Sequence, residues 1–341
     1  MSGPKAIYGL SQLRGVELAA SEINNSSFMK NNRIILIPMD DMGEPGRVGP
    51  LVTKLIYENK VIAMIGSVDS GCTHVISMMA VKSHTPHVTC VATDPSLTRA
   101  GNPWTFRTLA DDERQASALV NYFVGEKRKK KIAIIAAQSR YGKMGAKTFS
   151  YLAIKAGAEV FGPNFLDPEV KYQNPELIPA VDKLLQMNPD VIVLWTLAKD
   201  ALHIASYLSL KGFKGDVAGG DGLASPLFFA SKAPSVNGTV ITCPYDGSFP
   251  SKENDYFRAK FYENFQMEPD SFAAHAYDTL FLIAQGLSKS DGTRSGLRDA
   301  ISGTDAFQGV TGKIRLDKSG NDLRPAFLTR CQDGVLIPIE K

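Results

Sequence analysis

The chain alternates short apolar runs of strand length with longer segments in which apolar residues recur at helical spacing. In the segment 10–24, for example, Leu13, Val16 and Ile23 fall on one helical face. Strands that are apolar almost throughout, separated by crossover helices, are typical of parallel sheets covered on both faces. The predicted strands are 33–39, 61–65, 87–91, 132–137, 158–162, 191–195 and 217–219, and the predicted helices are 10–24, 45–59, 72–82, 112–126, 142–156, 175–187 and 198–211.

Two interruptions divide this alternation. A short strand-like piece at 106–109 links one series of strands and helices to the next, and a second piece at 240–245 leads into the helix-rich segments 253–265 and 271–288. Two α/β lobes joined by more than one chain crossing explain both interruptions. In this class of fold a ligand binds in the crevice outside the carboxyl ends of the strands.

Composition sets the broad class of the protein. The 341 residues are 44% hydrophobic and 21% charged, which is typical of a globular chain large enough for two domains. The formal net charge of +3 gives no field that favours nucleic acid or an anionic membrane. The one basic run, 127–131, is interpreted as the solvated end of a helix. No apolar stretch reaches the roughly 18 to 20 residues of a membrane span.

Motifs for catalysis and metal binding are missing from the sequence. There is no G-x-G-x-x-G after the first strand, no phosphate-binding P-loop and no G-x-S-x-G. The five histidines lack metal-ligand spacing, and His84 and His87 are interpreted as surface or strand-end residues. We therefore expect no catalytic residue, no metal and no cofactor. The widely spaced Cys72, Cys90, Cys243 and Cys331 leave the disulfide state open.

The segment 66–73 has the pattern of an anion site. A strand ends there in small polar residues and a helix follows at once, so that Ser70 to Thr73 would expose unpaired helix N–H groups. The alternative is that Ser70 merely caps the helix 72–82.

Two further loops at strand ends carry polar residues. Asp94-Pro95 reads as a helix start, which leaves Thr93 to face the cleft, and Asp221 is either a turn residue among glycines or a partner for an ammonium group.

Several segments, in this order, resemble the leucine/isoleucine/valine-binding proteins, the type I periplasmic solute receptors of ABC importers. The resemblance covers essentially the whole chain. It rests on 2–4, 8–9, 15, 19–20, 22–24, 40–41, 66–70, 92–98, 106–108, 141–142 and 309–322.

The resemblance implies a type I periplasmic-binding-protein fold, with two Rossmann-like lobes of parallel sheet joined by a three-segment hinge. Lobe one is expected at 1–108 and 247–317, and lobe two at 109–246 and 318–341. It also implies a monomeric, periplasmic or extracellular receptor that closes on its ligand and presents it to an ABC transporter permease. The first residues lack the basic, apolar and small-residue pattern of a signal peptide, so the expected location rests on the resemblance alone.

The resemblance also assigns ligand-binding roles. It implies that Ser70, helped by Thr93, holds an α-carboxylate, and that the carbonyl of Val91, the hydroxyl of Thr93 and the carboxylate of Asp221 take an α-ammonium. The family's aromatic walls fall at Tyr8, Tyr141 and Phe272.

Four departures from the family pattern stand out. Asp221 replaces the usual Glu, and Leu197 stands where a cleft tyrosine is common. Asp69 adds a carboxylate directly before Ser70; it either faces the ligand, which would disfavour a purely aliphatic side chain, or turns outward to cap a backbone N–H. Family members also carry a leader and a strand before the Ser2-Gly3-Pro4 loop, so either the start is truncated or another segment takes that strand's place.

Two alternative functions stay open at this stage. One is a receptor for an aromatic carboxylate or a small amide, which would use Ser70 and Thr93 but leave Asp221 without a cation. The other is a cytoplasmic ligand-sensing regulator on the same lobes, although no helix-turn-helix segment supports a repressor.

Overall fold

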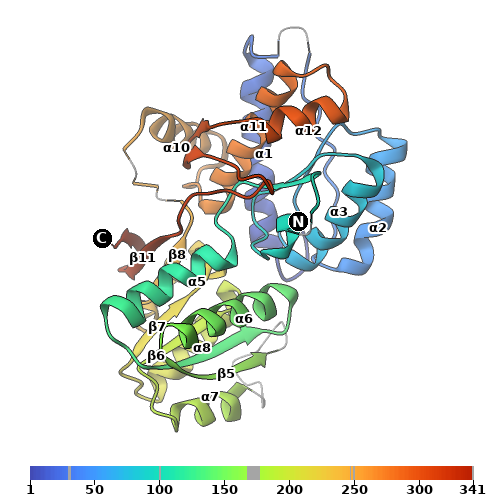
Figure 1. The fold of residues 1–341 in the computed structure, drawn as a ribbon. Coiled ribbons are helices and arrows are strands. Elements are labelled where there is room, and N and C mark those ends of the chain that lie inside the picture. The colour runs from blue at the N-terminus through green and yellow to red at the C-terminus, as the bar shows by residue number, and fades with distance from the viewer. Residues whose placement is uncertain (30–31, 100, 167–176, 246, 249, 340–341) are drawn as a thin grey trace. The chain divides into compact units, whose positions relative to one another are not determined.

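The computed structural model describes residues 1–29, 32–99, 101–166, 177–245, 247–248 and 250–339. These residues form two compact units (Figure 1). Unit 1 comprises Met1–Asp111 and Tyr245–Arg324, and unit 2 comprises Asp112–Pro244 and Pro325–Lys341. The chain thus passes between the units three times. The lobes expected from the sequence change after residues 108, 246 and 317, and their assignment as ligand-binding lobes stays a prediction.

Unit 1 is built on a short parallel sheet with the strand order β1-β2-β3. Its helices α1 and α11 pack closely against each other. The strands are β1 (Met64–Ile65), β2 (His87–Thr89) and β3 (Thr105–Arg107), with a separate antiparallel pair β9 (Phe307–Gly309) and β10 (Gly312–Ile314). The helices are α1 (Ala6–Asn25), α2 (Pro45–Thr53) continued by the π-helical turn η1 (Lys54–Glu58), α3 (Ser70–Ser83), α4 (Ser96–Arg99), α10 (Lys252–Phe265), α11 (Ser271–Lys289) and α12 (Arg294–Ser302).

The strand predicted at 33–39 is wrong, because this segment has no regular secondary structure. The backbone N–H and C=O of Ile34 are bonded instead to the side-chain amide of Asn24, at 2.7 and 2.9 Å. Within the described residues β1 bonds only to β2, and Ile35 is 83% exposed. An apolar run becomes a strand only where a neighbouring strand takes its hydrogen bonds, and the described chain provides none for this one.

Unit 2 contains a sheet of seven strands in the order β12-β11-β8-β7-β6-β4-β5. Strands β8 to β5 are parallel, as expected, whereas β11 and β12 form an antiparallel hairpin on the edge that the sequence analysis did not predict. The strands are β4 (Lys131–Ala137), β5 (Glu159–Leu166), β6 (Val191–Trp195), β7 (Asp216–Gly219), β8 (Val240–Cys243), β11 (Phe327–Gln332) and β12 (Val335–Pro338).

The four helices predicted in unit 2 are present with shifted ends, whereas the short helix α9 and the two 3₁₀ turns were not predicted. Residues 175 and 176 of the predicted helix 175–187 lie outside the described residues. The helices are α5 (Asp112–Val120) with the π-helical turn η2 (Asn121–Glu126), α6 (Arg140–Lys155), α7 (Leu177–Leu185), α8 (Ala198–Leu210) and α9 (Pro226–Phe229), with the 3₁₀ turns η3 (Asp221–Leu223) and η4 (Pro234–Val236).

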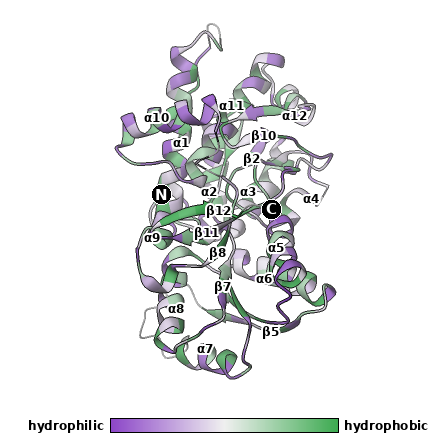
Figure 2. Ribbon diagram, turned by 90° about the vertical axis from the view of Figure 1, so that its left-hand side faces the viewer, coloured by the Kyte–Doolittle hydropathy of each residue, from purple (hydrophilic) through white to green (hydrophobic). Residues whose placement is uncertain are grey.

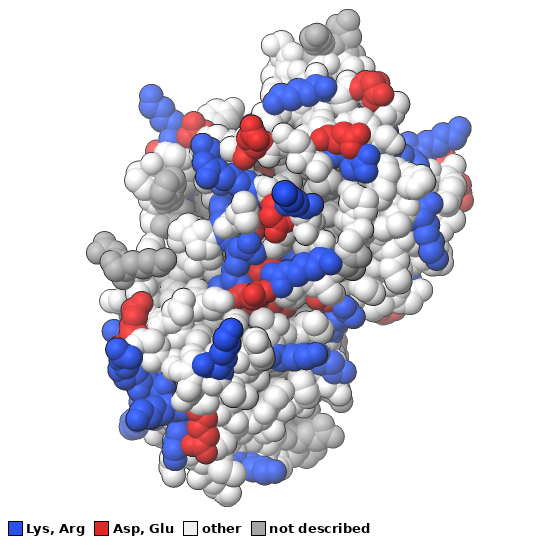
Figure 3. Space-filling model, in the orientation of Figure 1, with Lys and Arg blue, Asp and Glu red and all other residues white. Residues whose placement is uncertain are grey.

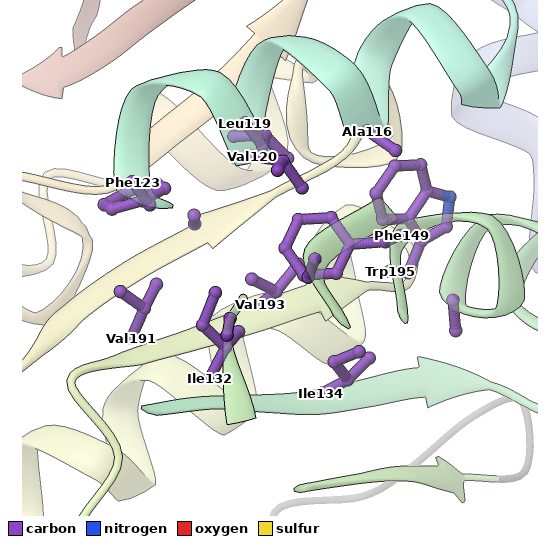
Figure 4. Close-up of a cluster of buried hydrophobic side chains, with 14 of the residues drawn as sticks. Ala116, Leu119, Val120, Phe123, Ile132, Ile134, Phe149, Val191, Val193 and Trp195 are labelled. Carbon is purple, nitrogen blue, oxygen red and sulfur yellow. The ribbon is translucent and has the colours of Figure 1, made fainter. Parts of the chain in front are cut away.

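The core of unit 2 lies between its sheet and the helices α5 and α6. Figure 4 shows Leu119 and Val120 of α5 pointing toward Val193 of β6, while Phe149 of α6 lies beside Trp195 with ring centroids 6.2 Å apart. All five side chains are buried. Full burial of an aliphatic or aromatic side chain contributes roughly 1.5 to 3 kcal/mol, so this layer fixes the strand ends from which the polar loops of unit 2 begin.

The distribution of polarity follows this packing. In Figure 2 the exposed helix α10 is largely purple, whereas the buried strand β8 is largely green. On the face shown in Figure 3, basic side chains lie among acidic ones on both units. None of the described helices is long and apolar enough to cross a membrane.

Of the two positions expected for His87, at the surface or at a strand end, the structure confirms the strand end: His87 is the first residue of β2 and is buried. Its Nε2 bonds to the carbonyl oxygen of Gly66, and its Nδ1 lies 3.4 Å from the hydroxyl oxygen of Thr105. Because the Gly66 carbonyl can only accept, Nε2 carries the proton of a neutral ring. Burial lowers the pKa of His87 from 6.5 to about 4. The sequence shows the polar residue but not the layer that covers it.

The first prediction concerns the contact of α1 with α11. A Cβ at Gly15 would lie 2.2 Å from the backbone oxygen of Ala273, whereas a Cβ at Gly49 in α2 would meet nothing within 4 Å. We expect Gly15→Ala to lower the free energy of unfolding by about 1 to 3 kcal/mol through overpacking. Gly49→Ala should raise it by up to about 1 kcal/mol. Chemical denaturation of both variants tests this, and equal effects would contradict the packing.

The second prediction concerns acid stability. Between about pH 6.5 and pH 4 the unfolded chain protonates His87 while the native chain does not, so this residue makes the protein less stable as the pH falls through that window. Across the whole window this residue lowers the free energy of unfolding by an amount on the order of 3 kcal/mol. His87→Gln keeps a donor and removes the titration. The difference in unfolding free energy between wild type and variant should therefore change with pH across this window, and a constant difference would refute the assignment.

Candidate functional site

The polar loops of unit 1 lie at one edge of its sheet. Strands β1 and β2 are parallel neighbours, with Met64 opposite His87 and Ile65 opposite Val88. The loop 66–69 follows β1 and leads into α3, and the loop 90–95 follows β2. Since parallel strands end at the same edge, these two loops meet at the carboxyl end of the sheet, where folds of this class bind ligands.

Asp69, and not Ser70, caps helix α3. Its Oδ1 accepts the backbone N–H of Cys72 at 2.9 Å, and its own N–H lies 3.3 Å from the Ser67 hydroxyl oxygen. The Thr73 hydroxyl donates to the Ser67 carbonyl at 3.0 Å, which ties the loop to the first turn of the helix. The alternative in which Ser70 serves as the cap is therefore wrong, because Ser70 is already the first helical residue.

This arrangement leaves two hydroxyl groups buried without a protein partner. Ser70 is 1% exposed and Thr93 is 0% exposed, and within the described residues neither hydroxyl oxygen has a hydrogen bond. A buried polar group without a partner costs about 1 to 3 kcal/mol. The N–H groups of Ser70 and Gly71, at the first two positions of the helix, have no intrahelical acceptor. Two hydroxyl donors and a helix N-terminus together favour an anion.

The loop that carries Thr93 is held by Arg107, which is fully buried at the end of β3. Its guanidinium donates to the carbonyl of Asp94 at 2.7 Å and to the hydroxyl of Thr98 at 3.1 Å. The carboxylate of Asp94 accepts the N–H of Ser96 at 2.9 Å, which agrees with the structural role predicted for it. Thr93 is thus placed by its neighbours.

Unit 2 gathers the other predicted polar residues in the same way. Tyr141, Leu197 and Asp221 follow β4, β6 and β7, which are neighbouring parallel strands. The Tyr141 hydroxyl donates to Oδ1 of Asp221 at 3.1 Å and accepts the N–H of Gly222 at 3.0 Å. A Cβ at Gly222 would lie 2.9 Å from this hydroxyl, and one at Gly220 would lie 2.8 Å from it. The glycines around Asp221 therefore permit close packing of Tyr141.

Asp221 is a buried acid whose side-chain contacts are neutral. It is 2% exposed, and burial raises its pKa to about 6 although bonds with Tyr141 and Gln115 oppose this rise. Gln115 fixes the backbone: its Oε1 accepts the Asp221 N–H at 3.0 Å and the Thr242 hydroxyl at 2.6 Å. Burial also raises the pKa of Tyr141 well above its ordinary value. An ionised carboxylate kept from water in this way is stabilised by a bound cation.

The remaining predicted residues are mostly apolar wall or core. Tyr8 and Phe272 make an edge-to-face contact in unit 1, with centroids 5.0 Å apart and planes at 87°. Val91 is buried in the loop after β2, and Leu197 is half-buried at the start of α8, against the core of unit 2. Unit 1 thus holds Tyr8, Asp69, Ser70, Val91, Thr93 and Phe272, and unit 2 holds Tyr141, Leu197 and Asp221.

Three residues that support these loops were missed from the sequence: Lys5, Arg107 and Gln115. Lys5 forms an ion pair with Asp69, so Asp69 both caps a backbone N–H and binds a cation. A lysine next to the Ser-Gly-Pro loop and an extra carboxylate before Ser70 were the only signals for that pair. Arg107 and Gln115 act through contacts distant in sequence, for which the sequence pattern has no marker.

Groups that could support other chemistry are few. Among the described residues no three or more His, Cys, Asp or Glu side chains are placed to hold a metal ion. All four cysteines are buried, and within the described residues Cys72, Cys90 and Cys331 form no disulfide bond. Burial raises the pKa of Cys90 and Cys331 to about 11, which disfavours reactive thiolates at neutral pH.

Comparisons with known proteins give the family. The family described as periplasmic binding protein matches residues 1–334. The chain is 24% identical, over 100% of its own length and 91% of the relative's, to Leu/Ile/Val-binding protein homolog 3 of Brucella melitensis. The leucine-binding protein LivK of Thermotoga maritima shares its fold at a TM-score of 0.92 and 21% identity, covering 100% of this chain and 95% of that one.

A solute-binding protein of an ABC transporter from R. palustris, solved with benzoate, matches at a TM-score of 0.90 and 22% identity, over 99% and 92% of the two chains. The fold is therefore that of the type I periplasmic binding proteins, as the sequence analysis expected. This is a family of ligand-binding proteins and not of enzymes, and the chain belongs to the periplasmic binding protein family.

Proposed function

We propose that this protein is the solute receptor of an ABC importer and that it binds an amino acid with a branched aliphatic or related side chain. The observation that carries the proposal is the pair of buried, unpartnered hydroxyls of Ser70 and Thr93 at a helix N-terminus. A ligand carboxylate has two oxygens that can accept from both hydroxyls and from the first N–H groups of α3.

The amino group of the ligand is assigned to Asp221. Its carboxylate is buried, its pKa is raised, and an α-ammonium would supply the missing positive charge. In this proposal the ligand is held at its carboxylate by unit 1 and at its ammonium by unit 2. Each charge-assisted hydrogen bond contributes roughly 1.5 to 3 kcal/mol. A few such bonds are enough for the roughly 8 kcal/mol of micromolar binding after the cost of ordering.

The relatives support two ligand classes. The names of the Brucella and Thermotoga proteins refer to branched-chain amino acids, whereas the R. palustris protein was solved with benzoate. An aromatic carboxylate would use Ser70 and Thr93 but would leave the buried Asp221 without a cation. Asp221 therefore favours the amino acid, and an aromatic carboxylate is the second candidate.

Location and partners follow from the same proposal. As a periplasmic receptor the protein works outside the cytoplasm, as a monomer, and delivers its ligand to a membrane permease by closing on it. Closure stabilised only by contacts made in the closed state would let the permease distinguish loaded from empty receptor.

The third prediction tests the carboxylate site. A thermal-shift screen over the amino acids and benzoate should identify a stabilising ligand, because bound ligand raises the melting temperature by mass action. Calorimetry with that ligand should then show at least tenfold weaker binding for Ser70→Ala, which corresponds to about 1.4 kcal/mol. Ser83→Ala, at the far end of α3, is the matched control and should bind as wild type does. Equal affinities for all three proteins would refute the assignment.

The fourth prediction tests the ammonium partner by its pH dependence. Only ionised Asp221 attracts an ammonium, and its pKa is about 6, so leucine affinity should level off above pH 6. It should fall about tenfold between pH 7 and pH 5, because a proton then competes for the carboxylate. Asp221→Asn should bind leucine weakly with a flat profile, and benzoate binding should lack the acid loss. A flat wild-type profile for leucine would remove Asp221 from the site but leave the carboxylate assignment intact.

A further inference from the structure

The side chain of Lys5 is fixed beside the candidate carboxylate site. Its ammonium pairs with Oδ2 of Asp69, the residue directly before Ser70, and the two side chains are only 16% and 4% exposed. The aliphatic stem of Lys5 lies over Gly43, where an added Cβ would come within 3.1 Å of the lysine Cδ. The residue directly before Ser70 therefore carries a charge that is nearly buried and is paired with a second, nearly buried charge.

Capping alone does not explain the charge of Asp69. Serine, asparagine and aspartate cap helices about equally well, so a neutral residue could accept the Cys72 N–H. A negative charge in a poorly hydrated site repels a bound carboxylate, whereas a lone lysine there would attract one. When the two side chains form their ion pair, their charges cancel. The anion site then has nearly neutral surroundings.

We propose that Lys5 and Asp69 are paired positioning residues that determine which carboxylates the site accepts. Lys5 neutralises Asp69, so that a single carboxylate can bind at Ser70. Asp69 in turn pairs with the ammonium of Lys5, so this ammonium is not available to bind a second carboxylate of the ligand. A second carboxylate therefore adds no binding energy. The pair thus selects ligands with one carboxylate over dicarboxylates. This inference rests on the proposed function, since it needs a carboxylate to bind at Ser70.

A purely structural role makes a different prediction. If the ion pair only tied the start of the chain to α3, loss of either partner would loosen the same contact, and both single variants would weaken binding. An electrostatic role gives changes of opposite sign, because one variant leaves a negative charge at the site and the other leaves a positive one.

The fifth prediction is a double-mutant cycle measured by calorimetry with L-leucine, benzoate and L-glutamate. Lys5→Met should weaken binding of leucine or benzoate at least tenfold. Asp69→Asn, which keeps the helix cap, should strengthen binding of leucine and benzoate several-fold. The gain in affinity should be largest for glutamate, which carries a second carboxylate. The double variant should return to within about threefold of wild type, because its charges are again balanced. Lys82→Met, on the same helix at its far end, is the charge control and should change nothing.

The possible outcomes distinguish failure of this inference from failure of the proposed function. If Ser70→Ala weakens binding but both single variants at Lys5 and Asp69 weaken it alike, without recovery in the double variant, the pair is only structural and the inference is wrong. If wild type binds none of the three probes, the proposed function and the inference fall together. Thermal unfolding of every variant shows whether it is folded. A variant that is unfolded is replaced by Lys5→Gln or Asp69→Ser, which should change the affinity in the same direction as Lys5→Met or Asp69→Asn.

Discussion

The candidate site depends on the capping of α3 by Asp69. Because this carboxylate takes the N–H of Cys72, Ser70 becomes the first residue of the helix and its hydroxyl is not used for capping. The first two N–H groups of the helix have no intrahelical acceptor, as in any α-helix, and the Asp69 side chain takes the N–H of Cys72 instead of theirs. A serine cap would have used the hydroxyl that now lies buried without a protein partner. The choice of Asp69 as the cap therefore leaves the Ser70 hydroxyl available for the ligand that the proposed function requires.

The two units share one arrangement of strands and loops but carry different polar groups. In both, parallel strands deliver polar residues to one sheet edge, and a buried side chain fixes the loops there: Arg107 in unit 1 and Gln115 in unit 2. Unit 1 offers hydroxyl and N–H donors, whereas unit 2 offers the buried carboxylate of Asp221. Under the proposed function the donors would hold the carboxylate of an amino acid and Asp221 would hold its ammonium group, which accounts for the opposite polarity of the two sets.

Much of this was predictable from the sequence, because strand ends are visible in it. The periodicity located six of the seven proposed strands, and Ser70, Thr93 and Asp221 come shortly after the ends of three of them. Interactions that span many residues were not predictable. The segment 33–39 looks like a strand but lacks a partner, and the buried state of His87 depends on the layer above it. Aspartate and serine are equally good caps, so the pattern could not distinguish Asp69 from Ser70.

The proposed function requires a ligand carboxylate that binds to Ser70 and Thr93. A crystal structure of the protein with the ligand found by the thermal-shift screen tests it most directly. In that structure the carboxylate oxygens should accept hydrogen bonds from the Ser70 and Thr93 hydroxyls at about 2.7 Å, the usual length of such bonds. A ligand whose carboxylate lies elsewhere, with both hydroxyls still without a partner, would contradict it.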